Sequence, residues 1–148
     1  MAVVEKSALV PYPASMLYEI VCDVAAYPEF LPWCKDARLL SRTESELCGE
    51  IVVSKAGVTR AFATCNRLFP HHRMEIRLKE GPFRKLEGAW EFTELREDAC
   101  KVSLRLEFEF SSGLMDKAFG VVFGQIANSL VDAFCKRAAW LAAHGRNP

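Results

Sequence analysis

Few residues in this chain have types and spacings suited to chemistry. Glu29 is an isolated acid in an apolar segment, where burial could raise its pKa and make it a general acid. A side chain that faces solvent or backbone amides is the simpler interpretation. His71 and His72 are adjacent, so an extended chain points them to opposite faces, and they predict no metal site. With no P-loop, dinucleotide-binding glycine pattern or nucleophile elbow, we expect a protein that is not an enzyme.

Binding of an apolar molecule is the better-supported expectation. The lid segment, residues 27–34 (YPEFLPWC), holds three aromatic residues and two prolines. Proline fixes φ and removes a backbone donor, which should exclude a long helix and push the preceding residues, Tyr27 and Leu31, toward extended geometry. Because so apolar a segment is costly to expose to water, we expect a short lid that lays Phe30, Leu31 and Trp33 onto an apolar surface.

The composition predicts one globular domain over residues 1–148, with 51% hydrophobic and 26% charged residues. The 19 basic and 19 acidic residues cancel, so no global field attracts nucleic acid or an anionic membrane. The N-terminal residues contain no signal-peptide hydrophobic run, and no apolar run approaches the roughly 20 residues that span a bilayer. We expect a cytoplasmic protein whose six widely spaced cysteines are free thiols: Cys22, Cys34, Cys48, Cys65, Cys100 and Cys135.

Hydrophobic periodicity predicts a strand, a helix, about six strands and one long helix. Residues 3–10 are rich in valine, and Pro13 can open a helix whose apolar residues recur at helical spacing up to Val24. Alternation with short polar turns then predicts an antiparallel meander with strands at 37–41, 50–55, 60–69, 74–78, 86–92 and 102–110. After residue 113 the period becomes that of a helix of six or seven turns, ended by Gly145.

These elements predict an α+β fold, in which a curved antiparallel sheet of about six to seven strands wraps around the C-terminal helix. A sheet with one apolar face needs a cover, and only that helix is long enough to provide it. The gap between them could hold a cavity, although filling a core explains any single residue there equally well. The expected lid and cavity residues are Tyr27, Phe30, Leu31, Trp33, Phe62, Asn66, Met74, Phe83, Trp90 and Phe123.

Several polar and small residues bear on this cavity. Asn66 and the indole N–H of Trp90 should face inward, where each needs a hydrogen-bond partner from the protein, a buried water or a ligand. Gly88, Gly120 and Gly124 indicate close backbone approach or room for a ligand. Residues 60–85 are rich in bases and residues 87–109 in acids, so neighbouring strands could neutralise each other; the alternative is a basic edge that touches RNA or phospholipid headgroups.

The lid segment, with Gly81-Pro82-Phe83 and the L-x-G-x-W block ending at Trp90, closely resembles one known family. This is the coenzyme Q-binding branch of the START/polyketide-cyclase-like superfamily, which includes ribosome association toxin A (RatA) proteins. The resemblance implies a helix-grip fold and a carrier that binds ubiquinone or a similar polyprenyl quinone, with transient contact at the inner membrane face. It also implies two alternatives, a toxin that binds the large ribosomal subunit and blocks subunit association, and an aromatic polyketide cyclase. No catalytic cofactor and no DNA partner are expected.

Overall fold

Seven strands form one antiparallel sheet in the computed structural model, which describes residues 2–111 and 114–145. Their order is β1-β7-β6-β5-β4-β3-β2, so strands β2 to β7 form a continuous meander and β1 closes onto β7. The predicted meander is confirmed, and each strand is longer than the periodicity indicated. The strands are β1 (Ala2–Val10), β2 (Cys34–Arg42), β3 (Glu46–Lys55), β4 (Val58–Phe69), β5 (Arg73–Glu80), β6 (Phe83–Arg96) and β7 (Ala99–Phe110).

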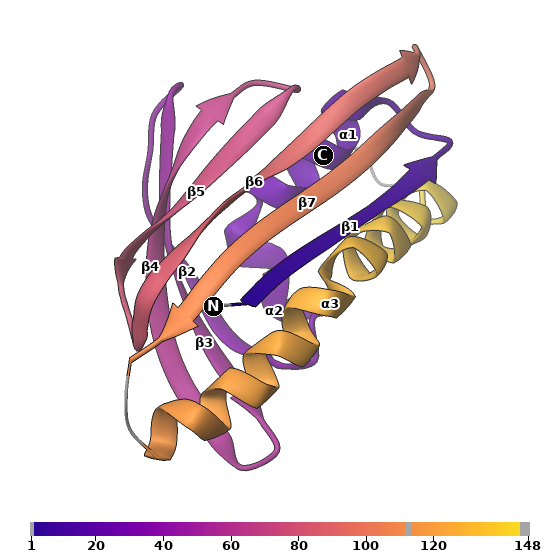
Figure 1. The fold of residues 1–148 in the computed structure, drawn as a ribbon. Helices are drawn as coiled ribbons and strands as arrows, with labels where there is room; N and C mark the ends of the chain where they lie inside the picture. Colours follow the sequence, from indigo (N-terminus) through magenta and orange to yellow (C-terminus); the bar gives the residue numbers. More distant parts are fainter. Residues whose placement is uncertain (1, 112–113, 146–148) are drawn as a thin grey trace.

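The helices lie on one side of this curved sheet (Figure 1). They are α1 (Ala14–Cys22), the short 3-10 helix η1 (Val24–Ala26), α2 (Tyr27–Phe30) and α3 (Leu114–Ala143). With 30 residues, α3 makes about eight turns, which is longer than predicted. Gly145 follows its end with φ of 62°, as expected for a residue that terminates a helix. The α3 helix packs against β1, β4, β7 and α1, and therefore closes the concave side of the sheet.

One face of α3 supplies much of the core. Its buried residues recur at helical spacing, as predicted: Phe119, Val122, Phe123, Ile126, Val131, Phe134 and Ala138. Alternate residues of β7 meet this face from the sheet side, namely Val102, Leu104, Leu106 and Phe108. By length and composition alone, residues 117–143 could cross a bilayer. In the fold their apolar face instead packs against the sheet.

The lid segment is partly helical. Tyr27 has helical dihedral angles (φ −52°, ψ −43°) and begins α2, whereas Leu31 is extended (φ −108°, ψ 101°). The prediction of extended geometry before each proline is therefore wrong for Tyr27 and confirmed for Leu31. The reason is that η1 runs directly into α2, and a proline in the first turn of a helix loses no hydrogen bond.

The cysteines differ from expectation in one respect. Cys48 on β3 and Cys65 on β4 are paired in register and form a disulfide, so the prediction of six free thiols is wrong for these two. It is confirmed for Cys22, Cys34, Cys100 and Cys135. The spacing of 17 residues did not reveal the pair, because only the register of the β3–β4 hairpin brings the two side chains together.

Candidate ligand cavity and its gate

A small inner cavity of about 100 Å³ lies between the sheet and α3. Seven of the ten predicted site residues line it: Tyr27, Trp33, Phe62, Asn66, Met74, Trp90 and Phe123. The prediction missed several aliphatic lining residues and Phe134. Alternation along β3 contained the signal for two of them, because Ile51 and Val53 both face inward from that strand.

The other three predicted residues lie elsewhere. Phe83 belongs to an aromatic cluster beside the cavity, with its ring centroid 5.0 Å from that of Phe123 and 4.9 Å from that of Phe110. Phe30 and Leu31 line a second space on the surface, which we call the outer groove. The outer groove has a volume of about 630 Å³ and lies between the lid segment and the C-terminal half of α3. Its residues are Glu29, Phe30, Leu31, Pro32, Trp33, Lys55, Ser129, Asp132, Ala133, Lys136, Arg137 and Trp140.

Trp33 lines both spaces and therefore forms the wall between them. Its side chain is buried, and its carbonyl oxygen accepts a hydrogen bond from the amide of Ser54 on β3 at 2.9 Å. Tyr27 is held in the same region by donating its hydroxyl proton to the carbonyl oxygen of Val21. We call Trp33 the gate, because moving its indole would join the inner cavity to the outer groove.

One hydrogen-bonding atom in the cavity is unpaired among the described residues. The side chain of Asn66 is buried, and its Oδ1 atom has no partner among the described residues. Its Nδ2 group donates only to Met74 Sδ, at 3.4 Å, and thioether sulfur is a weak acceptor. The buried indole of Trp90 packs edge-on against Phe134, with 5.2 Å between centroids. A buried polar atom left without a partner costs free energy, so Asn66 Oδ1 is a candidate contact for a buried water or a ligand.

The predicted glycines do not enlarge this cavity. A Cβ atom on Gly88 would lie 2.0 Å from the carbonyl oxygen of Arg105, so this position indicates close approach of β6 to β7. Gly120 and Gly124 line a different surface groove, beside β1. These two glycines therefore leave room in a groove between α3 and strands β1 and β7, and not in the inner cavity.

Glu29 is not a buried acid. Its side chain is 57% exposed, and its Oε1 atom accepts a hydrogen bond from Nη2 of Arg137 at 3.0 Å. Arg137 lies on α3 and is only 9% exposed. Its presence in an otherwise apolar helical pattern was the signal for this ion pair, which joins α2 to α3.

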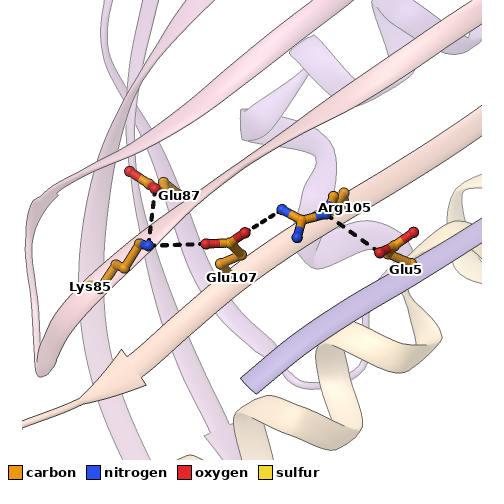
Figure 2. A network of polar contacts seen from close by, with 5 residues as sticks. All are labelled: Glu5, Lys85, Glu87, Arg105 and Glu107. Atoms are coloured by element: carbon orange, nitrogen blue, oxygen red, sulfur yellow. Dashed lines mark hydrogen bonds and ion pairs between the residues drawn. The ribbon is translucent and has the colours of Figure 1, made fainter. Parts of the chain in front are cut away.

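The outer face of the sheet carries a chain of ion pairs across three strands (Figure 2). Lys85 on β6 contacts Glu87 and also Glu107 on β7, at 3.2 and 3.0 Å. Arg105 contacts Glu107 and also Glu5 on β1. Hydrogen bonds from Lys85 and Arg105 lower the pKa of Glu107, so it stays charged near neutral pH. Mutual neutralisation, rather than a basic surface, is the outcome on this part of the sheet.

Cys34, the one thiol of the lid segment, is next to the gate in the chain. Burial raises the pKa of the Cys34 thiol to about 11, so it is protonated at neutral pH and a weak nucleophile. Within the described residues, no three His, Cys, Asp or Glu side chains gather closely enough to hold a metal ion. The polar side chains that line the inner cavity are those of Tyr27, Trp33, Thr64, Asn66 and Trp90. None of them is a carboxylate or a histidine.

A sheet wrapped around a C-terminal helix, with a cavity between them, defines a helix-grip protein of the START type. The Zhui aromatase/cyclase from Streptomyces sp. R1128 has the same fold, with a TM-score of 0.82 over 95% of both chains and 17% identity. At that identity the likeness concerns the fold alone.

The sequence comparisons are more specific. The family model "Polyketide cyclase / dehydrase and lipid transport" matches residues 10–135, and the chain belongs to this family. A relative named "Ribosome association toxin RatA" from Pseudomonas aeruginosa is 44% identical over 93% of this chain and 96% of its own length. The Xenopus laevis protein "Coenzyme Q-binding protein COQ10 homolog B, mitochondrial" is 28% identical over 90% of this chain and 56% of its own length. These names describe binding proteins and toxins, whereas the fold is also found in cyclases.

Proposed function

We propose that the protein is a non-catalytic carrier of a polyprenyl quinone, with ubiquinone as the expected ligand. The observation that carries this proposal is the apolar cavity with an unpaired amide oxygen, Asn66 Oδ1, behind the gate. Support also comes from the similarity to a protein named for coenzyme Q binding.

The inner cavity is too small for a whole lipid, and it must widen to admit the substituted ring of a quinone. A volume of about 100 Å³ is below the roughly 300–1,000 Å³ of ordinary small-molecule sites, but engineered apolar cavities of about 150 Å³ bind benzene. The isoprenoid tail must therefore leave the cavity, and the gate is the boundary that separates it from the outer groove. Asn66 Oδ1 can accept from a quinol hydroxyl, and the turned amide can donate to a quinone carbonyl.

The test is mass spectrometry of lipids extracted from natively purified protein. We expect quinone in the extract, and less of it from Trp90→Ala and from Trp33→Ala. Leu95→Ala is the control, because Leu95 is exposed and lines neither the inner cavity nor the outer groove. Protein that is purified empty, and stays empty when quinone is supplied in detergent, would refute the proposal.

A second candidate is binding to the large ribosomal subunit with a block of subunit association. It is favoured by 44% identity, over nearly the whole chain, to a protein named RatA. The bases of residues 60–85 lie on the interior strands β4, β5 and β6, so the prediction of a basic edge is wrong. Among them, Arg67, Arg73 and Lys85 contact acids. Arg77, Lys79 and Arg84 are exposed and have no ion-pair partner among the described residues, so rRNA phosphates would meet these three side chains.

Sedimentation with purified large subunits tests this second candidate. Binding should weaken with salt, and each phosphate contact contributes about 0.7–0.9 to the slope of log K against log salt concentration. We expect Arg77→Gln to reduce that slope by about 0.7–0.9, the share of one phosphate contact. Lys101→Gln, which lies outside residues 60–85, should leave the slope unchanged. Normal joining of subunits in excess protein would count against this candidate without affecting the quinone proposal.

A further inference from the structure

The outer groove has the properties of a ligand site that is separate from the inner cavity. Its volume of about 630 Å³ lies within the roughly 300–1,000 Å³ range of small-molecule sites. Phe30, Trp33 and Trp140 give it apolar walls. Lys55 and Arg137 line it as well, so apolar surface and positive charge meet in one groove.

Arg137 is the central polar group of this groove. Its side chain is 91% buried, and its guanidinium carbon lies 4.9 Å from the centre of the Phe30 ring and 4.8 Å from that of Trp140. Nη2 donates to Glu29, while Nε and Nη1 have no acceptor among the described residues. A guanidinium has five N–H donors arranged to bind a carboxylate with two parallel hydrogen bonds. The two rings therefore position the guanidinium of Arg137, and some of its N–H donors have no acceptor among the described residues.

The carboxylate that pairs with Arg137 is itself largely exposed to solvent. Glu29 is 57% exposed, belongs to a four-residue helix and makes a single contact with the guanidinium, and ion pairs with an exposed partner are weak. Without Glu29 the groove has three cations, Lys55, Lys136 and Arg137, against one acid, Asp132. Lys136 is paired with Asp132 at 3.0 Å, whereas Lys55 has no ion-pair partner within the described residues. The vacated groove would attract an anion.

We propose that the outer groove binds a single-chain carboxylate amphiphile. Its carboxylate replaces that of Glu29 on Arg137, and its chain lies against Phe30, Trp33 and Trp140. A carboxylate is the group to which Arg137 already donates a hydrogen bond, and the apolar walls suit a hydrocarbon chain. A neutral quinone would make no use of the cation, so this site goes beyond the proposed function. Because Trp33 is shared, an occupant of the groove also covers the outer side of the gate.

Titration calorimetry with dodecanoate, kept below the concentration at which it forms micelles, tests the proposal. We expect binding of one dodecanoate per chain, at least tenfold tighter than dodecanol, which has the same chain without the charge, and than propionate, which has the charge without the chain. Affinity should fall as salt is added. Equal binding of dodecanol would overturn the assigned role of Arg137. Equal binding of vesicles of anionic phospholipid, in place of free dodecanoate, would replace the proposal with a membrane surface.

Two substitutions give opposite expectations. Glu29→Gln removes the competing carboxylate from an exposed position, so dodecanoate should bind roughly two- to fivefold tighter, a factor that corresponds to a partly exposed ion pair. Arg137→Gln should weaken binding at least tenfold, and Lys101→Gln, on β7 and outside the lining of the groove, should not change it. Unchanged or weaker binding by Glu29→Gln would overturn the proposal even if Arg137→Gln fails to fold. Neither result depends on whether the cavity binds quinone.

Discussion

Replacing Asn66 with leucine should stabilise the empty protein and impair quinone binding at the same time. Asn66 Oδ1 is buried without a partner, and such an atom costs about 1–3 kcal/mol. The weak bond from Nδ2 to Met74 is lost in Asn66→Leu, which offsets part of the gain. Leucine has nearly the same shape and adds no polar atom, so we expect a net stabilisation of roughly 1–2 kcal/mol.

The expected change in melting temperature follows from the length of the chain. An unfolding entropy of about 2.1 cal/mol/K per residue gives roughly 0.3 kcal/mol/K for 148 residues. A gain of about 1–2 kcal/mol therefore raises the melting temperature by roughly 3–6 °C. Differential scanning calorimetry of lipid-free protein measures the shift, and lipid extraction measures the loss of quinone.

Thr64→Val is the matched control for this substitution. Thr64 lines the same cavity from the same strand but is only half-buried, so its hydroxyl can reach water and its loss should matter less. A lower melting temperature in Asn66→Leu would refute the reasoning, because it would mean that Oδ1 is already satisfied in the empty protein. A higher melting temperature with unchanged quinone content would keep the stability argument and remove Asn66 from the binding site.

Three further predictions concern stability and the thiols. Gly88→Ala should lower the melting temperature by several degrees, because the new Cβ would lie 2.0 Å from a backbone oxygen. Gly124→Ala should raise the melting temperature by roughly 2–4 °C through helix propensity, since nothing lies within 4 Å of its Cβ. Thermal denaturation of both variants checks the two signs. Thiol titration of the unfolded chain should find four reactive cysteines before reduction and six afterwards, and six thiols without reductant would contradict the pairing. Loss of the Cys48–Cys65 disulfide should lower the free energy of unfolding by about 3 kcal/mol. Burial raises the pKa of Cys34 from 9.0 to about 11, so the contribution of its thiol to stability is complete below about pH 9 and is lost as the pH rises toward 11. The free energy of unfolding of Cys34→Ser should therefore decline less steeply over that range. Identical pH profiles of the two proteins would show that Cys34 does not contribute.

The local pattern of the sequence determined the fold class. Strict alternation along β7 and the helical repeat of Phe119, Phe123 and Phe134 on α3 fix which side chains face each other, and an apolar sheet face must be covered by the one long helix. The same patterns placed most of the cavity residues, because the inward positions of a strand are set by its period of two.

Tertiary contacts decided what local pattern does not contain. Cys48 and Cys65 meet only through the register of a hairpin, and Glu29 meets Arg137 across 108 residues of chain. The lid segment predicted from its prolines and aromatic rings is divided by the fold, so that Tyr27 lines the inner cavity, Phe30 lines the outer groove and Trp33 lines both. The sequence by itself thus determined that an apolar lid exists, and the packing of α2 against α3 decided which of its side chains is the gate.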